Sequence, residues 1–312
     1  MTRVVKNRIA ANAYPHIYRL RTQVPRYNLH AQTRAFSRRA HQRGLGDARL
    51  YYWYHTVDLG GGPDHARDAR LPSSVDGFCF PDYTSGMNVL DVGSATGFFA
   101  FEFEFRSAQV VSVEVPSLDE VDRFPYQHQD ATQTVKTFAS MLAGQSDYTD
   151  EELEVLSSTS ARRVYELFLD GPFRLCHKAL NSGVERRYAT IYDLPETDLG
   201  AGSFDLVFLG DLLLHTIHPL KAMAAVASMC RGTLVISQHM PTDLRLGSRP
   251  AVLYVGGNTV EDHATWWYPN RQCFEQILGK LGFRHVEVVG RNTGVSSPGG
   301  IYYDRPVLPA VR

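Results

Sequence analysis

The chain has 312 residues, of which 44% are apolar and 21% charged, and its formal net charge is −1. This composition is typical of a soluble globular protein and excludes a disordered chain, which would be poorer in apolar residues and more highly charged. No run of about 18 apolar residues occurs, so we expect no membrane-spanning helix. Residues 1–21 also lack the apolar core of a signal peptide. The four cysteines are dispersed without a CxxC pair, so we expect a reducing, cytoplasmic location and no cysteine zinc site.

The charge is unevenly distributed along the chain. Residues 1–49 contain eleven Lys or Arg and one acid, Asp47, whereas the remainder carries a net charge of −11. Pro15 and Pro25 interrupt an otherwise helical pattern here, so we predict a basic helical arm over residues 1–50. This arm either docks on the acidic body of the same or a second copy, or contacts the phosphates of a nucleic acid or a phosphorylated substrate.

Residues 51–312 are predicted to form one domain in which strands and helices alternate. We expect strands at 88–92, 109–115, 188–192, 204–210, 234–238, 286–289 and 301–303, and helices at 98–106, 219–230 and 270–281. This alternation predicts an α/β, Rossmann-like fold, a seven-stranded and mostly parallel sheet with helices on both faces.

A long polar stretch, residues 126–187, separates the second and third predicted strands. It exceeds the connecting helix that such a fold needs by roughly forty residues. We predict a helical insertion, which is either a lid over the substrate or the interface of a homodimer.

The segment VLDVGSATG, residues 89–97, is the most specific in the chain. An apolar strand containing Asp91 leads to Gly93 and Gly97, and glycines there let the backbone approach a nucleotide closely. Glu114 ends the next strand, where an acid can accept hydrogen bonds from both hydroxyls of a ribose. A dinucleotide fingerprint requires glycines at 93, 95 and 98, and only the first is present. The D-x-G-x-x-x-G spacing indicates an S-adenosylmethionine site instead.

Further segments carry a resemblance to a known family. They are WYHTVDLG at 53–60, FDLVFLGDLLLH at 204–215 followed by Pro219, WWYPN at 266–270 and LGF at 281–283. With the glycine segment, they resemble the class I S-adenosylmethionine-dependent methyltransferases, in the branch similar to the wobble-uridine tRNA methyl/carboxymethyl transferases. The resemblance covers about residues 50–125 and 185–290.

The resemblance implies roles for individual residues. The expected cofactor-binding residues are Trp53, Asp91, Gly93, Ser94, Ala95, Gly97, Glu114, Val115, Ile191, Tyr192, Asp193 and Gly210. The glycine segment would line the methionine part of S-adenosylmethionine, Glu114 the ribose, and residues 191–193 the adenine. The expected substrate-binding residues are His55, Trp266 and Trp267, of which His55 would fold over the cofactor together with Trp53.

Methyl transfer requires alignment of the acceptor, the methyl group and the sulfur, and a hydroxyl acceptor also requires a base. The candidate catalytic residues are Asp211, His215 and His239. Asp211 and His215 are four residues apart, so one helical turn would place them on the same face. His215 could instead be a packed core histidine. Asp211, His215 and His218 could also be a metal set, but methyl transfer needs no metal and we predict none.

We therefore predict a methyltransferase that acts on an oxygen or nitrogen of a small molecule, of natural-product or sugar type. Aromatic richness and the large insertion favour an enclosed acceptor pocket. One alternative is a tRNA-modifying methyl or carboxymethyl transferase, with the basic arm as a phosphate clamp. Enzymes of that branch that use a carboxylated cofactor need cationic side chains around the carboxylate, and no such arginine is apparent near Trp267. A third alternative is a non-catalytic, cofactor-binding subunit.

Overall fold

The computed structural model describes residues 38–42, 44–45, 51–53, 78, 80, 84–123, 150–157, 160–241, 248–254, 265–296 and 301–312. Most of the predicted basic arm lies outside these residues, as do His55 and residues 126–149 of the predicted insertion.

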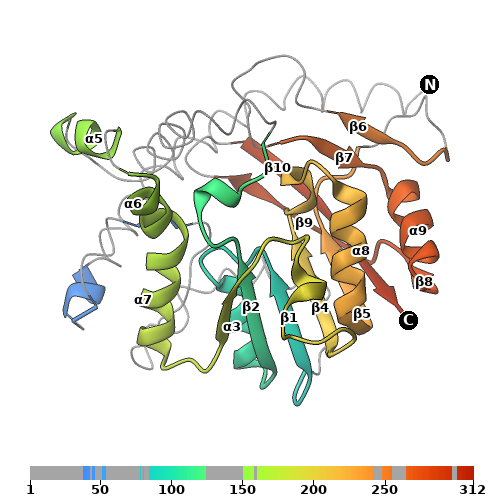
Figure 1. The fold of residues 1–312 in the computed structure, drawn as a ribbon, viewed down its shortest axis with the longest axis horizontal. Helices are drawn as coiled ribbons and strands as arrows, with labels where there is room; N and C mark the ends of the chain where they lie inside the picture. Colours follow the sequence, from blue (N-terminus) through green and yellow to red (C-terminus); the bar gives the residue numbers. More distant parts are fainter. Residues whose placement is uncertain are drawn as a thin grey trace, which may run out of the picture.

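A mostly parallel sheet forms the centre of the described structure (Figure 1). Its five parallel strands are β1 (Asn88–Val92), β2 (Gln109–Glu114), β3 (Glu185–Tyr188), β4 (Phe204–Gly210) and β5 (Cys230–Ser237). Three more strands, β8 (His285–Val286), β9 (Gly290–Ser296) and β10 (Ile301–Val311), complete it, and β10 runs antiparallel to β5, β8 and β9. The main path, β3-β2-β1-β4-β5-β10-β8, has the seven strands predicted, and β9 adds an eighth as a hairpin with β10. The Rossmann-like α/β fold is therefore confirmed.

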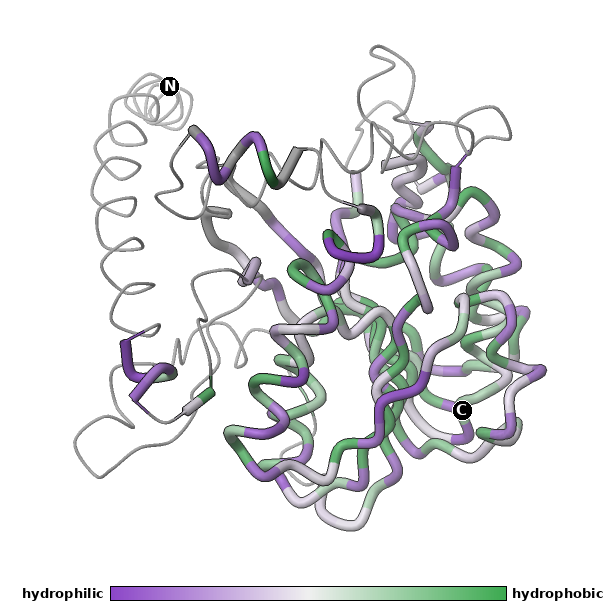
Figure 2. Tube along the Cα trace, turned by 60° about the vertical axis from the view of Figure 1, so that its left-hand side comes forward, coloured by the Kyte–Doolittle hydropathy of each residue, from purple (hydrophilic) through white to green (hydrophobic). Residues whose placement is uncertain are grey.

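Helices cover both faces of this sheet, which explains why the central strands are apolar on both sides. In β4, Leu206 and Phe208 pack on one face, whereas Val207 and Leu209 pack on the other. The first face is covered by α3 (Phe98–Phe105) and α7 (Gly171–Leu180), and the second by α8 (Pro219–Met229) and α9 (Arg271–Lys280). Figure 2 shows the apolar stretches gathered along these central strands and helices.

Several predicted strand bounds are wrong. Strand β5 begins at Cys230 rather than at 234, and β8 spans His285–Val286 rather than 286–289. The third strand, β3, spans Glu185–Tyr188 rather than 188–192, because a polar edge strand lacks the apolar run by which a buried strand is recognised. Residues 189–193 leave the sheet in a turn, in which Asp193 N–H donates to Thr190 C=O at 3.1 Å. The last strand, β10, extends eight residues beyond the predicted 301–303.

The predicted insertion is helical over 150–157 and 161–180, whereas its last residues, 185–187, belong to β3. It contains α5 (Asp150–Ser157), then α6 (Ala161–Tyr165), a π-helical turn (Glu166–Asp170) and α7 in one continuous stretch. Because α7 packs against the sheet, it is the ordinary connection from β2 to β3, and the additional helices precede it. The ring of Phe168, in the π-helical turn, stacks on Tyr52 with the ring centroids 4.3 Å apart.

A separate two-stranded sheet, β6 (Val252–Tyr254) with β7 (Trp267–Pro269), lies beyond the carboxyl ends of the central strands (Figure 1). The N–H of Trp266 donates to the carbonyl of Leu214 at 2.8 Å, and this bond ties the small sheet to the segment after β4.

Candidate active site

The loop from β1 to α3 turns through left-handed backbone at Gly93 (φ 71°), Ala95 (φ 47°) and Gly97 (φ 87°). The φ angle at Gly93 favours glycine, and a Cβ there would lie 2.7 Å from Cδ2 of Leu212, so the Leu212 side chain would have to move. The loop lies at the carboxyl edge of the parallel strands, where open α/β sheets bind ligands.

Glu114 closes this loop against the end of β2. Its Oε2 accepts a hydrogen bond of 2.8 Å from the N–H of Ala95, and its Oε1 accepts one of 3.0 Å from the N–H of Val115. The side chain is buried. Since each carboxylate oxygen has a second lone pair, both oxygens can still accept from a ribose hydroxyl.

Asp91 lies beneath the loop and is 1% exposed. Burial raises the pKa of its carboxyl to about 7; the positive charge of Arg186 opposes this shift and the negative charge of Glu114 adds to it. Its Oδ2 is buried and has no hydrogen-bond partner among the described residues. A buried acceptor without a partner is expected where a ligand or a water completes the site.

These features fit S-adenosylmethionine, whose methionine end carries an ammonium group. The buried oxygen of Asp91 and the backbone of Gly93–Gly97 would receive the methionine part, and Glu114 the ribose. Ser94 belongs to the same loop, and its hydroxyl is hydrogen-bonded to that of Ser112 at 2.6 Å.

The residues expected beside adenine follow β3. The N–H of Ala189 donates to the carbonyl of Glu114 at 3.0 Å, which brings this segment to the end of β2. Ile191 is buried in the core, and the exposed Asp193 accepts a hydrogen bond from the hydroxyl of Thr190. The hydroxyl of Tyr192 donates to Asp122, a residue that the sequence did not single out.

Asp122 joins two sides of the site. Its Oδ2 also accepts a hydrogen bond of 2.7 Å from the N–H of Ile217, after β4. The carbonyl of Ile217 in turn accepts one of 3.1 Å from the indole N–H of Trp267. A chain of contacts therefore runs from the end of β3 to the small β6-β7 sheet.

The expected tryptophans differ in their surroundings. Trp266 is 2% exposed, whereas Trp267 is half-buried with its ring 4.8 Å from that of Tyr254. Trp53 packs with the α3 and α7 face of the core, and its ring meets the edge of Tyr51. Trp266 is thus a core residue, and Trp267 remains the one that can wall a pocket.

Gly210 and Asp211 end β4, but the expected helical turn after them does not form. Asp211 adopts a left-handed conformation (φ 45°), and the following turn, Leu213–His215, is 3₁₀-helical. The interpretation that places Asp211 and His215 one α-helical turn apart is therefore wrong, because that spacing requires continuous α-helix. His239 follows β5, with its ring 4.9 Å from Tyr268 in an edge-to-face contact.

Polar groups gather around the ends of β4 and β5. The Nε of Arg305, on β10, donates to Oδ2 of Asp211 at 2.5 Å. Gln238, which follows β5, is 1% exposed, and neither atom of its amide has a partner in the described part of the chain. The hydroxyl of the neighbouring Ser237 is likewise buried without a partner there.

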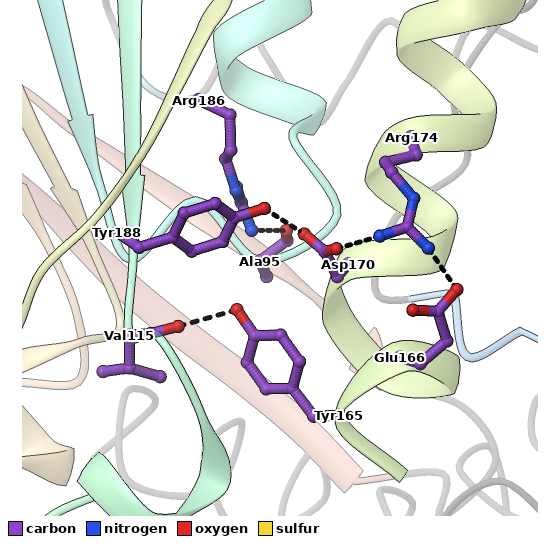
Figure 3. Close-up of polar contacts among 8 residues, drawn as sticks. All are labelled: Ala95, Val115, Tyr165, Glu166, Asp170, Arg174, Arg186 and Tyr188. Atoms are coloured by element: carbon purple, nitrogen blue, oxygen red, sulfur yellow. Dashed lines mark hydrogen bonds and ion pairs between the residues drawn. The ribbon is translucent and has the colours of Figure 1, made fainter. Parts of the chain in front are cut away.

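The insertion also contacts the site, as Figure 3 shows. The hydroxyl of Tyr165 donates to the carbonyl of Val115 at 2.7 Å, and that of Tyr188 donates to Asp170 at 2.5 Å. Arg186 donates to the carbonyl of Ala95 at 3.1 Å. The sequence did not single out Tyr165, Arg186 or Arg305. The register of β3 reveals Arg186, because it pairs with Ser112.

The described residues contain no group of three or more His, Cys, Asp or Glu side chains that could hold a metal ion. Within the same part of the chain, no helix is long and apolar enough to cross a membrane.

Comparison with known proteins identifies the family. The model of the methyltransferase domain matches residues 64–288. A tRNA U34 carboxymethyltransferase of Desulfotalea psychrophila is 27% identical over 118 residues, which are 36% of this chain and 35% of that protein. The alignment therefore spans about a third of the relative's length.

Solved structures of methyltransferases are also similar. The magnesium protoporphyrin IX methyltransferase of Synechocystis PCC 6803, with bound SAH, is 18% identical, covers 73% of this chain and 75% of its own, and has a TM-score of 0.40. The 1,6-didemethyltoxoflavin-N1-methyltransferase of Burkholderia thailandensis is 13% identical, covers 78% and 77%, and has a TM-score of 0.41. Since the family model matches most of the chain and the strand order is that of the expected fold, this chain belongs to the methyltransferase-domain family, as a class I S-adenosylmethionine-dependent enzyme.

Proposed function

We propose that this methyltransferase modifies an oxygen or nitrogen of a small molecule, of natural-product or sugar type. The observation that carries the proposal is the buried amide of Gln238, next to His239 in the chain, which has no hydrogen-bond partner among the described residues. A dehydrated amide is costly unless a ligand satisfies it. A small polar acceptor can reach such a buried group more readily than a polyanionic backbone can.

The bound cofactor supplies an activated methyl group on a sulfonium. In this proposal the glycine loop and Glu114 hold the cofactor, and Gly210 and Asp211 face the acceptor. Gln238 donates to and accepts from the acceptor's polar groups. His239 removes the acceptor's proton, with His215 as the alternative base, because imidazole is the side chain that changes charge near neutral pH.

An acceptor panel tests the proposal. The protein is supplied with methyl-labelled S-adenosylmethionine and with phenols, sugar alcohols, amines and tRNA, and the label is followed into each. Label in one small-molecule class supports the proposal, and label in tRNA alone contradicts it. With the acceptor found, Gln238→Leu should raise its KM at least about tenfold, whereas Gln276→Leu, on the exposed side of α9, should not.

The base is assigned with two further variants. His239→Ala should lower kcat by about 10²-fold or more, while His215→Ala should leave most of it if His215 only packs the loop. The reverse pattern would make His215 the base. Neither variant should change the affinity for S-adenosylhomocysteine.

Transfer to tRNA, as methyl or carboxymethyl, is the second candidate. Arg305 favours carboxymethyl transfer, because its guanidinium, which bonds to Asp211 at the end of β4, is a cation of the kind that a carboxylated cofactor requires. Mass spectrometry of nucleosides from treated tRNA would separate the two modifications. Steep loss of tRNA affinity with salt would indicate phosphate contacts.

The third candidate is a subunit that binds the cofactor without catalysis. Its sign would be cofactor binding with no label transferred to any member of the panel. Four features stay predictions: the homodimer, the basic arm at residues 1–50, the role of residues 126–187 as an acceptor lid, and the cytoplasmic location. Sedimentation with and without acceptor would test the first.

A further inference from the structure

A row of polar side chains crosses three strands beneath the cofactor loop. Asp91 on β1 pairs in register with Ser112 on β2, and Ser112 pairs with Arg186 on β3. Residues in register on neighbouring strands point to the same face of a sheet. Here that face is the one covered by α3 and α7, which is otherwise apolar.

The guanidinium of Arg186 is hydrogen-bonded to the loop from below. Its Nη1 donates to the hydroxyls of Ser94 and Ser112, the latter at 2.9 Å, and its Nη2 donates to the carbonyl of Ala95 at 3.1 Å. Ala95 is the residue whose N–H is bound by Glu114. Ala95 has a left-handed backbone conformation. Its N–H is therefore hydrogen-bonded to Glu114, and its carbonyl to Arg186.

Side chains beside the insertion hold the guanidinium in turn. Its central carbon lies 4.3 Å from the ring centroid of Phe173, on α7, and 5.8 Å from that of Tyr188. Tyr188 is fixed by its hydrogen bond to Asp170, in the π-helical turn (Figure 3). An arginine stacked on aromatic rings loses little freedom on forming further bonds.

We propose that Arg186 is the positioning residue of the cofactor site: it holds the side chain of Ser94 and the backbone carbonyl of Ala95, and it supplies the positive charge that faces Asp91. This role rests on the S-adenosylmethionine site and not on the identity of the acceptor. It also couples the insertion to the cofactor loop through Phe173.

The charged and polar groups that face Asp91 act in known directions. Arg186 on β3 and the N–H of Ala100 on α3 favour its ionised form, while burial and Glu114 on β2 oppose it. Removing the charge of Arg186 would therefore raise the pKa of Asp91 further. Because the methionine end of the cofactor carries an ammonium group, its binding requires the ionised carboxylate and weakens as the pH falls.

The test is the affinity for S-adenosylhomocysteine, measured by calorimetry between about pH 5.5 and 8.5, a range that spans the charge change of a raised carboxyl. For Arg186→Met we expect affinity at least about tenfold weaker at neutral pH, and an acid limb displaced upward by about one pH unit or more. Arg186→Lys keeps the positive charge but loses the planar guanidinium that donates to several partners. For this variant we expect weaker binding at every pH, with the acid limb at nearly the same pH as in the wild type.

Arg187→Met is the matched control. Arg187 adjoins Arg186 on β3 and is also only partly exposed, but it pairs with Glu185 and Asp198 rather than with the loop. We expect wild-type affinity and an unmoved limb. A loss of affinity equal to that of Arg186→Met would contradict the proposal, because Arg187 makes none of the contacts with the loop that Arg186 makes.

Three outcomes contradict the proposal. If the acid limb of the affinity profile does not move in Arg186→Met, the arginine is merely structural. If the limb moves as far in Arg186→Lys as in Arg186→Met, the charge of Arg186 does not act on Asp91. If Arg186→Met does not fold, Arg186→Lys and Ser112→Ala decide, because both keep the charge. Unchanged affinity in both would refute the fixing of the loop. None of these results depends on an acceptor, so failure of the acceptor panel is a separate finding.

Discussion

The hydroxyl of Tyr165 donates a hydrogen bond of 2.7 Å to the backbone carbonyl of Val115, the residue that follows Glu114 (Figure 3). Glu114 itself accepts from the N–H of Val115, so both backbone groups of this residue are occupied. Burial raises the pKa of Tyr165, which keeps the hydroxyl protonated as a donor. The helical stretch before α7 is thereby fastened to the edge of the cofactor site.

Tyr165→Phe should loosen this attachment. We expect a loss of about 1 kcal/mol in the free energy of unfolding, the usual value of one hydrogen bond, and a roughly threefold to tenfold weaker affinity for S-adenosylhomocysteine. Chemical unfolding and calorimetry measure the two. Ser228→Ala is the control, since its hydroxyl also donates to a backbone carbonyl, that of Ala225 at 2.6 Å, but on α8, away from the loop. Equal effects of the two variants on cofactor affinity would contradict the assignment.

Much of the fold is predictable from local sequence. The bounds of β1 and β4 are those predicted, because strands buried on both faces are short, apolar runs ended by polar or glycine residues. The predicted third strand begins three residues and ends four residues too late, because the sequence of β3, ERRY, has no apolar period. Its polar side chains are explained only by contacts with β2 and the loop.

Some residues of the candidate site can likewise be predicted from the sequence, and others cannot. The glycine loop and Glu114 are readable because their spacing follows from one strand, one helix and the next strand. Arg186 and Arg305 are not, since they reach Ser94 and Asp211 across 92 and 94 residues. Such contacts depend on strand register, which a single sequence does not specify at an edge.

Glu114→Gln should weaken cofactor binding at least about tenfold, because the amide NH₂ cannot accept the N–H that one carboxylate oxygen now accepts. Calorimetric titration with S-adenosylhomocysteine measures the change. Glu104→Gln is a matched control: Glu104 also accepts from a backbone N–H, that of Gly183 at 2.5 Å, but it lies on α3 away from the loop. Unaltered affinity in Glu114→Gln would remove Glu114 from the site.

Asp91→Asn should stabilise the cofactor-free protein at high pH. The pKa of Asp91 in the folded chain is raised to about 7. The contribution of protonated Asp91 to the free energy of unfolding is therefore fully present below the pKa of an unfolded Asp, about 4, and is lost as the pH rises from about 4 to about 7. Asparagine carries no charge and avoids that loss. The difference in unfolding free energy between Asp91→Asn and the wild type should therefore be more favourable to the variant at pH 8 than at pH 4, by on the order of a few kcal/mol.

Unfolding at the two pH values, without cofactor, measures this difference. The same substitution should weaken cofactor affinity, since the ammonium group loses its buried anion. A difference in stability between Asp91→Asn and the wild type that does not change with pH would show that Asp91 does not titrate in this range.

Gly93→Ala should be costly for two separable reasons, a left-handed backbone angle and a Cβ 2.7 Å from Cδ2 of Leu212. Gly202→Ala isolates the first, because Gly202 has a φ of +66° and nothing within 4 Å of the position of a Cβ. We expect Gly202→Ala to cost about 1 kcal/mol of unfolding free energy with unchanged cofactor affinity. Gly93→Ala should cost more and weaken cofactor binding, because Leu212 must move and the loop with it. Adding Leu212→Ala should then recover part of the affinity. If Gly93→Ala resembled Gly202→Ala in both measurements, the close approach of Leu212 would have no part in shaping the cofactor loop.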